Sequence, residues 1–314
     1  MAKNSKIFKT LTQFWQAMTM VKADGTAVDF VEEADLTSGS AKTQIVDSTG
    51  TIGDITGENA FITQDILIEV ARGNVPGMKM FSIVGKKNSI SSSVLDDITG
   101  IPSTTVRPNP GGIQLELVSS SNEDSGAGGV NPAGTGIRSI DIHYLDNAGA
   151  EQSETVVIDG TTPVNTLAEN IDFVQWIHAK TAGSAGVAVG NISLRNTAGS
   201  VTYEYVKLGG NQSLSAAFKV PTGKKGYVLG WQASGITKII DIRLRATVER
   251  YDRTLIAGVF LFQDILILSD DSSGWIPFDV PKQMPAGAII KLSAISSAAG
   301  GDAAGQFDIL LIDD

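Results

Sequence analysis

The sequence predicts a mainly β protein, with an antiparallel β-sandwich or jelly-roll-like body, a short N-terminal helix and an extended arm. The first observation is the segment 218–249, in which apolar and polar residues alternate after a turn at 221–226. Strand side chains point alternately to two faces, so this alternation indicates one buried and one solvated face. The second is a series of short apolar segments separated by turns, which is typical of sandwiches and barrels. The third is composition, since 34 glycines and 18% charged residues favour turn-rich β-structure.

Composition also limits chemistry and partners. The chain of 314 residues contains no cysteine, which excludes disulfides, thiolate metal ligands and a cysteine nucleophile. Its formal net charge is -10 and its basic residues form no cluster of the kind that binds phosphates, so we expect no nucleic-acid partner. The longest apolar stretch, 255–262, is much shorter than the about 20 residues of a membrane-spanning helix. We therefore expect no membrane insertion, and the N-terminus lacks the apolar run of an export signal.

The periodicity of residues 1–22 predicts a helix. Apolar residues recur at alternating spacings of four and three, which places them on one narrow stripe. With the tryptophan beside it, this stripe is the candidate partner-docking surface, made of Ile7, Leu11, Phe14, Trp15, Met18 and Val21. Such a short helix is unstable alone in water, so it packs either on its own domain or on a partner or symmetry mate.

The pattern divides the chain into three regions. Residues 1–60 are expected to form the helix and an attachment arm, residues 61–111 an extended linker or strand region, and residues 112–314 the sandwich body with room for two subdomains. In the second region, Ile66, Ile68 and Val70 alternate as on one face of a strand, and 101–112 contains three prolines, which favour irregular extended backbone.

Strands of the body are predicted from alternation, and their ends from Gly, Asn and Asp turns. Residues 122–136 are a long Gly/Ser/Asn loop, residues 167–180 fit a strand or a short helix, and residues 255–268 fit a buried apolar strand or pair of strands. The remaining expected strands cover 113–117, 140–144, 153–158, 187–195, 201–208, 240–248, 275–280, 288–294 and 307–312.

No catalytic, cofactor-binding or metal-binding constellation is recognised. The two histidines, His143 and His178, lack the spacing of a zinc site, and adjacent carboxylates such as those of Asp96 and Asp97 point apart on a strand. We therefore expect a protein that is not an enzyme and holds no cofactor. Trp231 is expected in the core, whereas Trp275 follows a Ser-Ser-Gly turn and could stack on a sugar ring if it is exposed.

The polar face of the segment 240–248 carries charges of both signs. Asp241, Arg243, Arg245 and Glu249 alternate with the apolar residues. Opposite charges on neighbouring strands stabilise a sheet, so we expect these four residues to pair with a neighbouring strand or subunit rather than to bind a ligand.

Several segments, taken in order, resemble a family of structural proteins of tailed bacteriophages that is common in environmental phages. They are ARGNVPG at 71–77, GAEQSET at 149–155, DGTTPV at 159–164, VPTGKKGY at 220–227, DIRLR at 241–245 and DILLID at 308–313. Each segment alone is a generic turn or strand, and their order carries the resemblance, which covers about residues 66–314. The resemblance implies a virion component and carries over no catalytic residue.

These observations lead to one expected function and two alternatives. We expect a non-enzymatic virion protein, made in the bacterial host cytoplasm, that forms a homotrimer and decorates the capsid surface or builds a head fibre. Its partners would be copies of itself, the major capsid or tail and portal proteins, and a host surface glycan. The alternatives are a tail-fibre or tail-attachment subunit, and a polysaccharide-binding or depolymerising protein, which would need carboxylates converging in a cleft.

Overall fold

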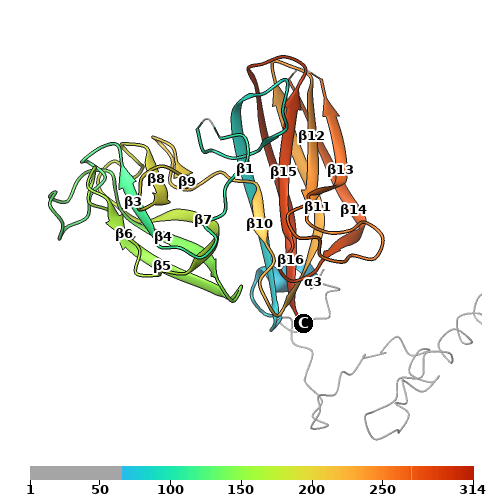
Figure 1. Ribbon diagram of the computed structural model, residues 1–314, viewed down its shortest axis with the longest axis horizontal. Helices are drawn as coiled ribbons and strands as arrows, with labels where there is room; N and C mark the ends of the chain where they lie inside the picture. The colour runs from blue at the N-terminus through green and yellow to red at the C-terminus, as the bar shows by residue number, and fades with distance from the viewer. Residues whose placement is uncertain (1–65, 103, 270) are drawn as a thin grey trace, which may run out of the picture. The chain divides into compact units, whose positions relative to one another are not determined.

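The computed structural model describes residues 66–102, 104–269 and 271–314, and it confirms the predicted fold class. The described chain is mainly β, with antiparallel sheets packed as a sandwich and one short helix (Figure 1). The predicted helix 1–22, with its docking stripe, and the arm that follows it lie outside the described residues.

Two sheets face each other; eight strands form their main paths, and a ninth, β2 (Asp96–Asp97), also pairs with β15. One sheet has the order β1-β16-β11-β14 and the other has the order β10-β15-β12-β13. The strands are β1 (Met78–Ile90), β10 (Ala217–Lys219), β11 (Lys224–Ile236), β12 (Ile240–Ala246), β13 (Leu261–Leu268), β14 (Ser272–Met284), β15 (Ile289–Ser296) and β16 (Gly301–Asp313).

The strand pairing defines a jelly roll. The first half of these strands pairs antiparallel with the second half in reverse order, as β1·β16, β10·β15, β11·β14 and β12·β13. The chain is thus a long four-pair hairpin, rolled so that successive pairs alternate between the sheets and β16 and β15 also meet β11 and β12. This double-sheet arrangement is the jelly roll that the sequence left as an alternative to a simpler sandwich.

The space between the two sheets is filled by apolar side chains. Trp231, Phe307 and Phe218 are its largest residues, and each is at least 99% buried. The apolar face predicted for β12 is confirmed, since Ile240, Ile242, Leu244, Ala246 and Val248 are fully buried. Trp231 is a core residue, as expected from its apolar sequence neighbours.

A second β unit is inserted between β1 and β10. One of its sheets has the order β6-β3-β8-β9 and the other has the order β5-β4-β7, and they enclose a separate apolar core. Its strands are β3 (Leu115–Ser119), β4 (Ile137–Asp146), β5 (Glu151–Val157), β6 (Val164–Asn165), β7 (Ile171–Ala182), β8 (Ile192–Asn196) and β9 (Thr202–Val206). The segment 167–180 is therefore mainly strand rather than helix.

The two connections to the insert lie side by side. The Gly100 N–H donates to the Leu214 carbonyl oxygen at 2.8 Å, and the Ala216 N–H donates to the Ile98 carbonyl oxygen at 2.9 Å. Just before this crossing, β2 (Asp96–Asp97) pairs with β15 of the jelly roll. Closely spaced chain ends are what allows one domain to be inserted into another.

Two expectations about local structure are wrong. Residues Ile66–Ala71 form the helix α3 rather than a strand. The Arg72 N–H donates to the Ile68 carbonyl oxygen at 3.0 Å, as in a helical turn. Gly73 follows with a φ of 77°, the left-handed conformation that commonly ends a helix. Ile68 is exposed and Val70 is buried, so the two do not share a face. The segment 255–268 contains the single strand β13, and much of it is exposed rather than buried, because β13 lies at a sheet edge.

The domain boundary in the sequence also differs from the arrangement in space. β1 belongs to the region expected as a linker or strand segment, yet it pairs along nearly its whole length with β16 at the end of the chain. β1 is therefore part of the same sheet as β16.

The Gly-rich loop 122–136 is held by two buried carboxylates. Asp124 is fully buried and accepts hydrogen bonds from the N–H groups of Ile137, Val189 and Gly190 and from the Ser119 hydroxyl. Asp159 accepts the N–H groups of Val130 and Asn131 at 2.8 and 2.7 Å. These backbone hydrogen bonds lower the pKa of Asp159, since they favour the charged carboxylate.

Candidate functional site

The charges of the predicted pairing face lie on and just beyond β12, but they pair in three different ways. Arg243 forms an ion pair with Asp241, two residues away on the same strand, and its Nη2 donates to Oδ2 at 2.6 Å. These hydrogen bonds raise the pKa of Arg243. The Arg243 guanidinium also lies 4.6 Å from the centre of the Phe262 ring on β13. Glu249 accepts the N–H groups of Tyr251 and Asp252 and so holds a turn. Pairing of these residues with another subunit stays a prediction.

Arg245 reaches across the sheet to a buried carboxylate that the sequence did not single out. Its Nη1 lies 4.0 Å from Oδ1 of Asp97 and 3.3 Å from the Ser293 hydroxyl. Lys291 donates to Oδ2 of the same Asp97 at 2.7 Å. Asp97 is 3% exposed, so two cations from the jelly roll surround one carboxylate of β2. Burial lowers the pKa of Lys291, and the Asp97 charge opposes that shift.

A second buried ion pair joins the insert to the connections. Nε and Nη2 of Arg107 both donate to Oε1 of Glu204 on β9, at 2.9 and 2.5 Å. Oε2 of Glu204 accepts the Ser215 hydroxyl at 2.9 Å, and the Arg107 guanidinium also donates to the Val174 carbonyl oxygen. Both charged side chains are at least 97% buried. Asp97, Arg107 and Glu204 are together called the polar seam, and they lie where the connections join the insert to the jelly roll.

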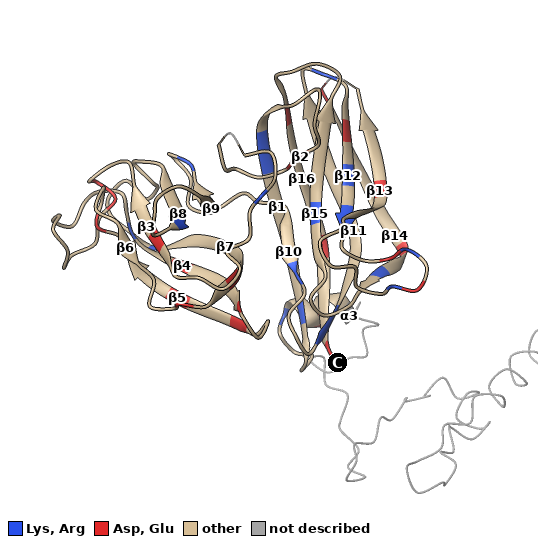
Figure 2. Cartoon of the chain, in the orientation of Figure 1, with Lys and Arg blue, Asp and Glu red and all other residues tan. Residues whose placement is uncertain are grey.

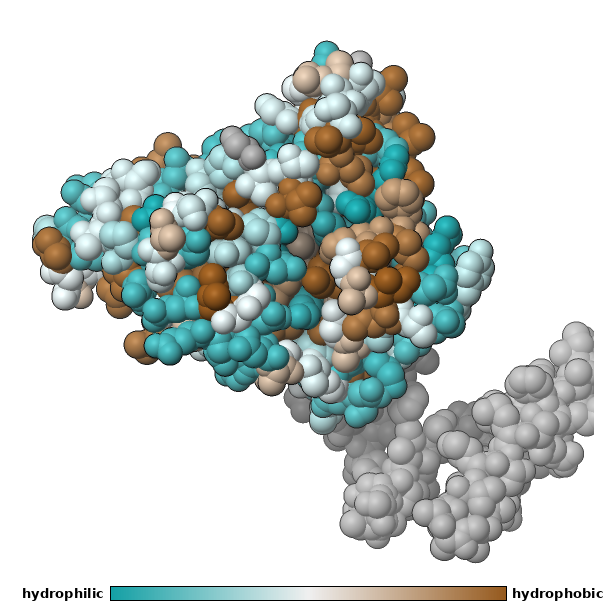
Figure 3. Space-filling model, in the orientation of Figure 1, coloured by the Kyte–Doolittle hydropathy of each residue, from teal (hydrophilic) through white to brown (hydrophobic). Residues whose placement is uncertain are grey.

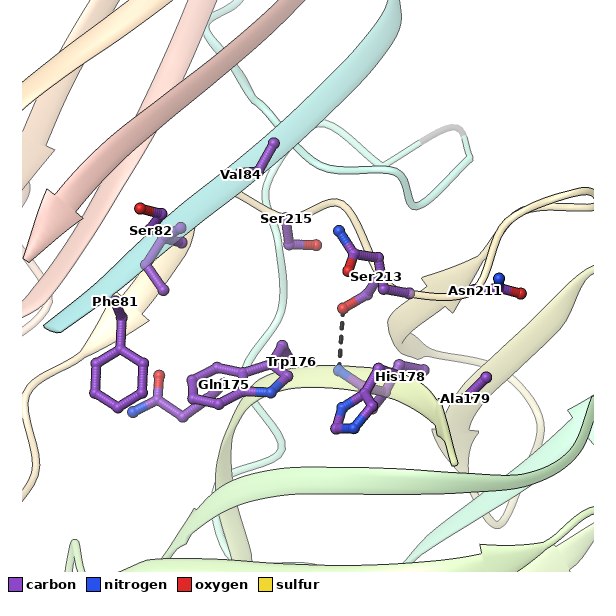
Figure 4. A pocket seen from close by; sticks show the side chains of 13 residues that line it. Phe81, Ser82, Val84, Gln175, Trp176, His178, Ala179, Asn211, Ser213 and Ser215 are labelled. Atoms are coloured by element: carbon purple, nitrogen blue, oxygen red, sulfur yellow. Dashed lines mark hydrogen bonds between the residues drawn. The ribbon is translucent and has the colours of Figure 1, made fainter. Parts of the chain in front are cut away.

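A groove of about 390 Å³ lies between β1 and β7 (Figure 4). Phe81, Ser82 and Val84 line one wall, and Trp176 and His178 line the other, with Ser213 and other polar residues of the segment 211–215 between them. The Ser213 hydroxyl accepts the Ile177 N–H at 3.0 Å, which fixes this segment against β7. Aromatic groups, uncharged polar groups and His178 make up much of the lining.

A row of rings extends from this groove over the insert. Trp176 lies 5.4 Å from Phe81 and 4.8 Å from His143, and His143 lies 5.2 Å from His178. Burial, and next the neighbouring His178, lower the pKa of His143, although Asp141 opposes the shift. The register of β4 and β7, with His143 opposite Trp176, brings together histidines that are 35 residues apart in the sequence.

The edges of the jelly roll are not alike. β13 is an eight-residue edge strand whose outward side chains Phe262, Ile265 and Ile267 are 39%, 48% and 68% exposed. Figure 3 shows apolar side chains gathered over the part of the jelly roll that carries β12, β13 and β14. Trp275 of β14 is 51% exposed, as its position after a turn suggested.

Among residues 66–102, 104–269 and 271–314, no group of three or more His, Asp or Glu side chains is placed to hold a metal ion. No helix among these residues is long and apolar enough to cross a membrane.

Comparisons with known proteins place the chain in no family. No protein-family model matches it, and no curated protein does. Three solved structures with a low-scoring likeness come from infectious bursal disease virus. The Gt strain has 10% identity, coverage of 76% of this chain and 74% of that chain, and a TM-score of 0.21. The T13 viral particle has 9%, 75% and 73%, with a TM-score of 0.17, and the VP2 subviral particle has 10%, 75% and 72%, also with 0.17.

These scores are too low for the likeness to carry an argument. The class of the protein is therefore defined by its own strand pairing, as a jelly roll with a β domain inserted between its first two strands.

Proposed function

We propose that this chain is a non-enzymatic structural subunit of a tailed-phage virion, a homotrimer that decorates the capsid surface or forms a head fibre. The observation that carries the proposal is a jelly roll whose interior is filled by apolar side chains. Jelly rolls occur in viral capsid proteins, lectins and cupins. Because side chains fill the interior of this one, it would contact its partners through its outer surfaces. The resemblance of residues 66–314 to phage structural proteins supports the same class.

The polar seam of Asp97, Arg107 and Glu204 supports a structural role in which the insert is held firmly on the jelly roll. Lys291 pairs with Asp97 within the jelly roll, and Arg107 pairs with Glu204 of the insert. The Arg107 N–H donates to Asp97 Oδ2 at 2.9 Å and so links these two buried pairs. A virion subunit must keep its outer domain in a fixed relation to the surface that docks on the particle. The docking surface in this proposal is the predicted stripe of residues 7–21, and a tail-fibre or tail-attachment position is the alternative.

The test is co-purification with particles. The protein should band with virions in a density gradient after high-salt washing, at a fixed ratio to the major capsid protein by quantitative mass spectrometry. A cryo-EM map of those particles should contain density for the jelly roll and its insert in threefold clusters. A protein that stays wholly in the soluble fraction of an infected lysate would refute the proposal.

A second candidate function is binding of a host surface glycan. The favouring observation is the groove between β1 and β7, which offers Trp176, Phe81 and uncharged polar groups. Exposed Trp275 is a separate candidate contact. A glycan array probed with the full chain, and with Trp176→Ala and Trp275→Ala variants, tests both positions. Binding that neither substitution reduces would remove both assignments.

A further inference from the structure

The edge of β13 is open and apolar. In the described part of the chain β13 pairs with β12, and its other side has no strand. The N–H of Ile265 donates to Oδ1 of its neighbour Asp264 at 3.0 Å, so it is not given to β12. Because backbone groups alternate in direction along a strand, the N–H and C=O groups of Ile265 and Ile267 face the open side.

The other edges of the two sheets carry features that oppose pairing with another chain. β10 is three residues long. β1 exposes Lys79 and Lys86, and β14 contains Pro277 and Pro281, which lack an N–H. Short strands, lysines and prolines are the usual means by which edges are protected.

β13 has none of these features. Its sequence LFQDILIL contains no Lys, Arg or Pro, and Figure 2 shows no basic residue on it. Its one charged side chain, Asp264, accepts the Trp231 indole N–H at 3.0 Å through Oδ2 and so points toward the core. Two features hinder pairing at this edge: the inward-pointing Asp264, whose Oδ1 accepts the Ile265 N–H, and an irregularity of the β12 register at Gln263. The rest of the edge is long and apolar and has no Lys, Arg or Pro, so it can act as a template for strand pairing.

We propose that β13 pairs antiparallel with β13 of a second copy of this chain, in a register centred on Leu266. A twofold axis there places Ile265 opposite Ile267 of the second copy and repeats that pair once, so apolar side chains meet apolar side chains. In this register the Ile265 N–H exchanges its present acceptor, Asp264 Oδ1, for the Ile267 carbonyl oxygen of the second copy. Asp264 falls opposite Leu268 of the second copy, so like charges do not meet. Arg243, whose side chain lies on the same outer surface, forms an ion pair with Asp241, so it does not bring an unpaired charge to the contact.

The contact is small, and this sets its expected strength. A standard stable interface buries about 800 Å² per partner, whereas even a large aromatic side chain buries only about 150–250 Å². Phe262, Ile265 and Ile267 together fall short of that, so the pairing is expected to depend on concentration. It is compatible with a trimer, because each copy has one β13 edge and could join one trimer to another.

The first experiment measures mass against concentration. The full chain, examined by sedimentation velocity over a hundredfold range of concentration, should form an assembly with twice the mass of that formed by Ile265→Lys/Ile267→Lys. The matched control, Leu167→Lys/Val280→Lys, adds the same charge at positions 88% and 81% exposed and should behave as the unmodified chain. Equal masses for the unmodified chain and the Ile265/Ile267 variant would overturn the proposal, including the case in which the edge accepts a different protein.

The second experiment tests the register. Because the chain has no cysteine, a single introduced cysteine reacts alone. A mixture of Ile265→Cys and Ile267→Cys chains, treated with a short bifunctional maleimide, should yield several-fold more cross-linked dimer than either chain alone. Equal yields in all three samples would overturn the twofold register. Neither result depends on particles, so failure here and failure of virion co-purification are distinguishable.

Discussion

Neutralising Glu204 should destabilise the protein more than neutralising a comparable carboxylate at the surface. Its side chain is fully buried, and Oε1 receives two hydrogen bonds from Arg107 while Oε2 receives one from Ser215. Glu204→Gln keeps the volume and leaves the Arg107 guanidinium buried without its counter-charge. Breaking a buried ion pair in this way costs about 3–5 kcal/mol.

The expected loss is large relative to the total stability of about 5–15 kcal/mol of an ordinary domain. At about 2–4 °C per kcal/mol for a protein of this size, the melting temperature should fall by roughly 6–20 °C. Differential scanning calorimetry measures this directly, and urea unfolding followed by tryptophan fluorescence gives the free energy of unfolding.

The matched control is Asp314→Asn, which neutralises the partner of Lys225 in a pair whose side chains are 51% and 41% exposed. Exposed pairs contribute about 0–1 kcal/mol, so this variant should melt within a few degrees of the unmodified protein. The apolar double variant Arg107→Met/Glu204→Leu should recover much of the loss, because it leaves no unpaired charge. If Glu204→Gln and Asp314→Asn lost the same small amount, the burial argument would be refuted.

Three further predictions concern the crossing, the loop and the histidines. Gly85→Ala should lose about 1–3 kcal/mol in urea unfolding, because its Cβ would lie 2.4 Å from the Ala216 nitrogen, whereas Gly100→Ala, with 3.6 Å to its nearest neighbour, should lose little; similar losses would contradict the packing argument. Asp124→Asn weakens hydrogen bonds worth about 1.5–3 kcal/mol each, so amides 183–190 should exchange with deuterium about tenfold faster or more, and unchanged protection would show that the carboxylate is dispensable. Because burial lowers the pKa of His143 below its ordinary 6.5, the unfolded state binds its proton more readily, so stability should fall as pH drops below about 6.5 and level off below the folded-state pKa. His143→Gln should flatten this part of the pH–melting profile, whereas a profile equal to that of the unmodified protein would assign the dependence to other groups.

The strands themselves could be predicted because alternation is a local property. Ile240, Ile242 and Leu244 had to face a core whatever lay opposite, and the structure buries all three. The hairpin at 196–199 could likewise be located from its turn residues. The same local reasoning failed at residues 66–71, where the apolar spacing was compatible with a strand and a glycine at positive φ ended a helix instead.

The candidate site was much less accessible from the sequence. Asp97, Arg107 and Glu204 come from segments separated by up to 107 residues, and none has a partner at a spacing that would mark it. His143 and His178 could be named individually, but their stacking depends on the register of β4 with β7. An adjacent pair of acidic residues such as Asp96 and Asp97 gave no signal that one of them would be surrounded by cations.

By itself, then, the sequence determined which residues face inward along each strand, because the period of two is built into the extended backbone. It could not determine which strands pair, because an apolar face shows that a strand is buried but not which other strand lies against it. The tertiary structure decided that β1 joins β16, that a whole domain is inserted between β1 and β10, and that β13 lies at an edge. That last placement leaves an apolar sequence, which alone favours burial, exposed to other chains.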